Sequence, residues 1–174
     1  MDTLGLAVSG NRILFAGGKV LDPTSTILYN VNEGTWTPAG NISADRACGA
    51  GITSPDGSFA LVAGGESGSK KKFANVDRFD AASGKWSVLP SLSQARSFLA
   101  AATVVDPLTN HTYSLFGGGE IEEGKKGGDS GRVDIFDHAT SSWLTSGDFL
   151  SKAHPNPNPN PNPNPNHNPK PQVV

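Results

Sequence analysis

Residues 58–86 read SFALVAGGESGSKKKFANVDRFDAASGKW, and three features of this stretch recur once before it and once after it. The features are a glycine pair that closes an apolar run, an aromatic residue, and a tryptophan seven positions after the aromatic. The three sets are Gly17, Gly18, Tyr29 and Trp36; Gly64, Gly65, Phe79 and Trp86; and Gly117, Gly118, Phe136 and Trp143. The tryptophans are spaced by 50 and 57 residues, and a repeat of this length is typical of repeat proteins. The sequence therefore predicts three repeats.

Each repeat divides into short apolar runs that are separated by turn-forming residues. Glycine, proline, asparagine and aspartate punctuate the chain at residues 9–10, 54–57 and 106–110, where a reversal of direction needs them. No segment shows helical periodicity, so the pattern indicates antiparallel strands throughout. The predicted strands are residues 4–8, 11–16 and 26–31; 47–53, 58–63 and 74–79; and 98–105, 111–116 and 132–136, with a fourth strand that each tryptophan opens.

The composition divides the 174 residues into a folded part and a tail. The tail is residues 153–174, in which prolines and asparagines alternate strictly from 155 to 166. Each proline restrains itself and its predecessor to extended conformations and cannot pair within a sheet, so we expect a disordered, solvated spacer. The folded part is residues 1–152, with repeats at about 1–45, 46–95 and 96–152.

Charge and targeting features narrow the class of protein. The net charge of −2 gives no chain-wide field for nucleic acid, so we expect no nucleic-acid partner. No run approaches the length of a membrane span, and the first residues lack both the basic and the apolar segment of a signal peptide. The single cysteine, Cys48, has no partner for an internal disulfide. We expect a cytoplasmic protein, with the nucleus as the alternative, and no membrane partner.

The glycine pair, the aromatic and the spaced tryptophan resemble the kelch repeat, and residues 54–65, SPDGSFALVAGG, are similar to the first half of such a unit. The resemblance covers about residues 3–152. It implies an all-β fold of kelch-type β-propeller blades, each a four-stranded antiparallel sheet. It also implies that the glycines end the second strand and that the aromatic and the tryptophan pack between neighbouring blades. The shorter WD40 repeat fits less well, because Thr37, Ser87 and Leu144 stand where its aspartate follows the tryptophan.

Three blades make an incomplete, open propeller, since closed ones have about four to eight. Open blade faces invite association. Two interpretations follow from the sequence. The chain is a fragment of a longer propeller, which we favour because terminal repeats without caps are unusual, or two copies associate through their open faces.

Enzyme signatures are weak, and we expect no catalytic residue, no cofactor and no metal. Residues 119–126 nearly match a phosphate-binding loop, but Lys126 replaces its hydroxyl residue and three glutamates would repel phosphate. The segment 128–131, GDSG, lacks a partner histidine for a serine hydrolase. Some kelch relatives are copper oxidases, but the chain offers only Tyr29 and Tyr113 as tyrosine ligands. An incomplete piece of a galactose-oxidase-like or carbohydrate-active propeller enzyme is the alternative function.

The candidate binding residues lie in the connections between strands. Two arginines and a histidine occur three positions after a serine, where strand one of the next blade begins, and lysine runs follow the glycine pairs. Arginine suits recognition of carboxylates, so we predict a protein-interaction module that binds an acidic partner through these loops. In the competing interpretation the arginines are framework residues and the lysines keep long loops soluble. The candidates are Arg46, Arg96, His154, Lys70, Lys71, Lys72, Lys125 and Lys126.

Overall fold

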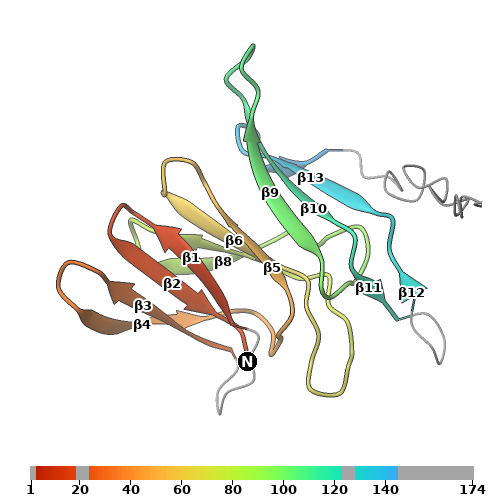
Figure 1. Ribbon diagram of the computed structural model, residues 1–174, viewed down its shortest axis with the longest axis horizontal. Helices are drawn as coiled ribbons and strands as arrows, with labels where there is room; N and C mark the ends of the chain where they lie inside the picture. The colour runs from red at the N-terminus through yellow and green to blue at the C-terminus, as the bar shows by residue number, and fades with distance from the viewer. Residues whose placement is uncertain (1–2, 19–23, 123–127, 145–174) are drawn as a thin grey trace, which may run out of the picture.

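The computed structural model describes residues 3–18, 24–122 and 128–144. These residues form only strands, turns and loops, so they include no helix that could cross a membrane. Three four-stranded antiparallel sheets account for nearly all of the strands, and none of them closes on itself. The prediction of an all-β chain with three such sheets is confirmed. Figure 1 shows the sheets following one another from the N-terminus.

Each sheet is built from consecutive segments of the chain. Sheet 1 contains β1 (Leu4–Val8), β2 (Arg12–Ala16), β3 (Ser25–Asn30) and β4 (Thr35–Asn41). Sheet 2 contains β5 (Ala50–Thr53), β6 (Phe59–Ala63), β7 (Val76–Asp80) and β8 (Lys85–Leu89). Sheet 3 contains β9 (Ala100–Val105), β10 (Thr112–Gly117), β13 (Val133–Asp137) and β14 (Ser142–Trp143). A separate pair, β11 (Glu120–Ile121) and β12 (Gly128–Asp129), extends from sheet 3.

Two details differ from the sequence prediction. The small β11–β12 pair lies in the segment that we expected to be an irregular loop. The glycine pair of the third repeat is Gly118–Gly119, whereas the sequence indicated Gly117 and Gly118. Gly117 belongs to β10, and Gly118 N donates to a backbone carbonyl at the start of the third strand, as Gly64 N does in sheet 2. Three consecutive glycines left this register open in the sequence.

The protein core lies between the sheets, because side chains alternate between the two faces of each strand. One face of sheet 1, including Leu6 and Leu14, packs against Val62 and Phe79 of sheet 2. The opposite face of sheet 2 packs against sheet 3 in the same way, with Phe136 buried at the contact. Large aromatic side chains supply much of the apolar area that such contacts remove from water.

Each tryptophan stands beside the aromatic residue that precedes it by seven positions. The ring centroids are 4.5 Å apart for Tyr29 and Trp36, and 5.2 Å apart in the other two pairs. Trp86 also reaches back to sheet 1, where its indole N–H donates to the Ala39 carbonyl at 2.9 Å. Trp143 makes the matching bond to the carbonyl of Pro90, at 2.7 Å. Trp36 is 56% exposed, because it lies on the outer face of sheet 1.

In the second and third repeats, the second glycine of the pair allows two connections to approach closely. Gly65 has φ of 112°, and a Cβ placed there would lie 2.7 Å from the Ala47 carbonyl oxygen. Gly119 has φ of 93°, and a Cβ there would lie 2.4 Å from the Ser97 carbonyl oxygen. Residues with a side chain rarely adopt such φ values, so these positions require glycine for two independent reasons. The close approach brings the connections to one edge of the stack.

Candidate interaction surface

The connections between strands leave the sheets at two opposite edges. In sheet 2, Ala50 pairs with Ala63 and Val76 pairs with Leu89, so β5 and β7 begin at the edge where β6 and β8 end. The connections that precede β5, join β6 to β7 and follow β8 therefore lie together at this edge. We call it the connection edge. In the described chain it consists of residues 42–49, 64–75, 90–99, 118–122 and 128–132.

Arg46 and Arg96 lie inside the connection edge, with exposed fractions of 2% and 0%. Arg46 Nη2 donates to Asp77 Oδ2 at 2.5 Å and to a backbone carbonyl of β6 at 3.1 Å. Arg96 pairs with Asp134, and its Nη1 donates to the backbone carbonyls of Gly118, just after β10, and Arg132, just before β13. Burial lowers the pKa of the Arg96 guanidinium, although the charge of Asp134 opposes this effect. An arginine remains charged at neutral pH, so each site is a buried ion pair.

The serine that stands three positions before each arginine binds the same carboxylate. Ser43 donates to Asp77 from its backbone N at 3.1 Å and from its Oγ at 3.0 Å. Ser93 N donates to Asp134 at 3.1 Å. The serine and the arginine thus fasten each connection to the third strand of the next sheet. Because their guanidinium groups are enclosed and already paired, the arginines have the geometry of framework residues, and this corrects our assignment of them as anchors for a partner.

Lys72 is also engaged within the protein, with an exposed side-chain fraction of 8%. Its Nζ lies 2.6 Å from Glu66 Oε2 and 3.1 Å from Glu120 Oε2, and it donates to Ser97 Oγ at 2.6 Å. Burial alone would raise the pKa of Glu66, but its contacts with Lys72 and Ser97 lower it. Burial alone would lower the pKa of Lys72, but the two glutamates raise it. This ion pair network joins the β6–β7 and β8–β9 connections to β11, and it withdraws Lys72 from the candidate binding residues.

Lys70 and Lys71 are the exposed members of the lysine run. The turn at residues 67–71 closes through hydrogen bonds from Ser67 N to the Lys71 carbonyl, at 3.0 Å, and from Lys70 N to the Ser67 carbonyl, at 2.9 Å. The Lys70 side chain is 80% exposed, and its Nζ lies 3.9 Å from the nearest oxygen of Glu66. The Lys71 Nζ lies 5.7 Å from the centroid of the Phe73 ring. The turn therefore presents two cationic groups to solvent at the connection edge.

Phe98 is a surface residue that our sequence analysis did not single out. Its side chain is 56% exposed, although it precedes β9 and stands at the same edge as the lysine turn. Its φ is 55°, a left-handed value that is rare for aromatic residues, and its backbone N donates to the Cys48 carbonyl at 2.7 Å. The Lys72 Nζ lies 5.7 Å from its ring centroid. The sequence placed Phe98 at the start of the predicted strand 98–105, so it gave no signal of this exposure, whereas β9 begins at Ala100.

Three of the sequence candidates, His154, Lys125 and Lys126, lie outside the described residues. Within the described part of the chain, no group of three or more histidine, cysteine, aspartate or glutamate residues is arranged to hold a metal ion. Ser130, in the segment that resembles a hydrolase loop, donates its Oγ to Gln94 at 2.7 Å. In the part of the chain that the structure describes, the connection edge thus combines enclosed ion pairs, exposed lysines and the exposed ring of Phe98.

No model of a known protein family matches the chain, and a search of curated proteins finds no match.

Proposed function

We propose that this chain is a kelch-type β-propeller protein that acts as a non-enzymatic protein-interaction module through its connection edge. The repeated construction of the sheets supports the architectural part. Each sheet has four antiparallel strands in chain order, a glycine pair with positive φ at the end of its second strand, and an aromatic-tryptophan pair in register across its last two strands. Each connection passes directly from the fourth strand of one sheet to the first strand of the next.

The observation that carries the functional part is the exposed Phe98 ring, whose centroid lies 5.7 Å from the Nζ of Lys72, the residue that follows the lysine turn. A residue that is held in an unfavourable backbone conformation, with its ring in water, costs free energy in the isolated protein. Aromatic side chains are enriched at the centres of protein interfaces, where they supply most of the binding energy. Lys70 and Lys71 add positive charge at the same edge, which attracts acidic groups and speeds encounter. The partner that fits this surface is a protein segment with an apolar side chain flanked by carboxylates.

A displayed peptide library, selected on the intact chain, tests this proposal. We expect the selected peptides to be acidic and to contain an apolar residue. Phe98→Ala should weaken their binding by about 30-fold or more, as for an interface hot spot. Leu108→Ala is the matched control, since this equally apolar side chain is 93% exposed and lies in the turn at the opposite edge.

The lysines have a control of their own. Reversing the charge of Lys70 and Lys71 together should weaken binding several-fold and flatten its salt dependence. Lys85→Glu changes an exposed lysine at the opposite edge and should leave binding unchanged. Peptides without acidic residues, or affinities that do not respond to Phe98→Ala, would contradict the proposed surface.

A further inference from the structure

The outer face of sheet 1 is apolar, and no sheet formed by the described residues covers it. Phe15 pairs across the strands with Ile27, and Tyr29 pairs with Trp36, so their side chains share this face. The Phe15 and Trp36 rings lie 5.5 Å apart, and the Tyr29 and Trp36 rings 4.5 Å. Trp36, Ile27 and Val31 are among the exposed large apolar side chains of the described residues. An apolar surface of this kind marks a site of association.

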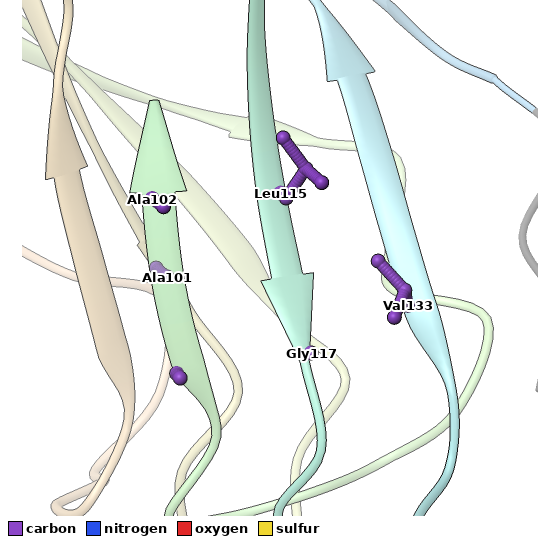
Figure 2. A pocket seen from close by; sticks show the side chains of 6 residues that line it. Ala101, Ala102, Leu115, Gly117 and Val133 are labelled. Atoms are coloured by element: carbon purple, nitrogen blue, oxygen red, sulfur yellow. The ribbon is translucent and has the colours of Figure 1, made fainter. Parts of the chain in front are cut away.

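The outer face of sheet 3, at the other end of the stack, is apolar and hollowed. Ala102 pairs with Leu115, and Gly117 pairs with Val133, so these residues lie on one face of the sheet. They line a depression of about 250 Å³ whose lining is almost entirely apolar. Figure 2 shows Ala102, Leu115 and Val133 on three neighbouring strands. The side chains here are small, so the depression has room for larger ones.

The contacts inside the chain show what covers such a depression. At the positions of sheet 2 that correspond to Ala102, Leu115 and Val133 stand Ile52, Leu61 and Val76, and these are buried. Phe116, Phe136 and Trp143 of sheet 3 pack against them. By register, these three rings correspond to Phe15, Tyr29 and Trp36 of sheet 1. The exposed rings of sheet 1 are therefore of the kind that fills the depression on sheet 3.

The charges on the two outer faces fit a contact between separate chains. Within the chain, each contact between sheets contains a buried aspartate, Asp77 or Asp134, that is neutralised by an arginine from the covalent connection. The corresponding position in sheet 1 is Ile27. A contact between two chains has no such connection, and an aspartate there would be buried without its arginine. Because Ile27 is uncharged, a contact through the outer face of sheet 1 needs no arginine at this position.

We propose that a second copy of this chain covers both outer faces. The sheet 1 rings of each copy fill the sheet 3 depression of the other, and the two head-to-tail contacts close a ring of six sheets. Closed rings of radially packed sheets contain about four to eight, and with three sheets per chain only two copies fall in that range. This proposal is independent of the partner surface at the connection edge, because it uses the faces of the sheets.

Light scattering during size exclusion, on the full chain at about 50 µM, tests the proposal. We expect twice the 18.0 kDa of one chain. Trp36→Lys and Ala102→Glu alter one outer face each, at exposed positions, and each variant alone should have the mass of one chain. Leu108→Glu changes an exposed apolar residue away from both faces and should keep the mass of two chains.

Mixing the two variants distinguishes a head-to-tail contact from a symmetric one. In a mixed pair, one contact retains both native faces, and the other places the new lysine opposite the new glutamate. The mixture should therefore recover the mass of two chains. A native chain that elutes with the mass of one chain, a single variant that keeps the mass of two, a mixture without recovery, or open polymers of increasing mass would each overturn the proposal. Circular dichroism of each variant checks that the strands are retained.

Discussion

Asp77 lies in β7, and its carboxylate is bound by Ser43 and Arg46 of the connection between sheets 1 and 2. Replacing Asp77 by alanine removes this carboxylate. The change breaks three hydrogen bonds, from Ser43 N, Ser43 Oγ and Arg46 Nη2. It also leaves a guanidinium group that is 2% exposed without its counter-charge. Breaking a buried ion pair in this way costs about 3–5 kcal/mol. Since a domain of this size is stable by about 5–15 kcal/mol, the loss is a large fraction of the total.

Urea unfolding, followed by tryptophan fluorescence at one fixed protein concentration, measures this cost. Asp45→Ala is the matched control, because Asp45 is an exposed carboxylate adjacent to Arg46 and its removal should change stability by less than about 0.5 kcal/mol. The double variant Arg46→Leu with Asp77→Ile tests the cause. Arg46 Nε and Nη1 are buried without a hydrogen-bond partner in the described part of the chain. Two apolar side chains in place of Arg46 and Asp77 should therefore restore most of the lost free energy of unfolding, as sheet 1 already has the apolar Ile27 at the position of Asp77.

Two results would refute this reasoning about the ion pair. If Asp77→Ala costs less than about 1 kcal/mol, the guanidinium group is not enclosed as described. If the double variant is as unstable as Asp77→Ala alone, the loss does not arise from an unpaired charge.

Three further predictions concern the backbone and the titratable groups. Gly65→Ala should destabilise the protein by at least about 2 kcal/mol more than Gly84→Ala, because both positions have positive φ but only at Gly65 would a Cβ meet backbone atoms. Thermal unfolding compares the stabilities of the two variants, and equal losses of stability would contradict the close approach at Gly65. The lowered pKa of Glu66 contributes stability that is present above its ordinary value of 4.5 and is lost as the pH falls further, so Glu66→Gln should flatten the acid limb of a pH-stability curve. Burial lowers the pKa of His138, so its contribution should decline as the pH falls below 6.5, and His138→Gln should remove that decline; an unchanged curve would contradict the assignment.

The repeat pattern of the sequence predicted the order and approximate bounds of the strands in the three large sheets, because turn residues and strand alternation are local properties, but it did not predict the β11–β12 pair. The roles of the connection residues were harder to predict. A serine followed three positions later by an arginine indicated a surface motif in the sequence. The arginine is enclosed only because one sheet packs on the next, which the local sequence does not show. The aspartates that complete the pair lie more than thirty residues further on in the chain, where nothing local marks them.

Single residues in the connections illustrate the same limit. Lys72 follows two exposed lysines, and only its tertiary contacts with Glu66, Ser97 and Glu120 distinguish it from them. Phe98 begins an apolar run, so its sequence context predicted a buried strand residue. Its left-handed φ turns it out of that strand, and this conformation depends on a hydrogen bond to the preceding connection.

The most direct test of the account is whether the tryptophans join neighbouring sheets, and nuclear Overhauser effects from the Trp86 ring measure it. A Cβ placed at Gly40 would lie 3.4 Å from Trp86 Cδ1, and the Trp86 indole N–H donates to the Ala39 carbonyl. We expect strong cross-peaks from the Trp86 ring to the Hα protons of Gly40, in sheet 1. A Trp86 ring with cross-peaks only to residues of its own sheet would contradict the stacking of the sheets on which the proposed propeller depends.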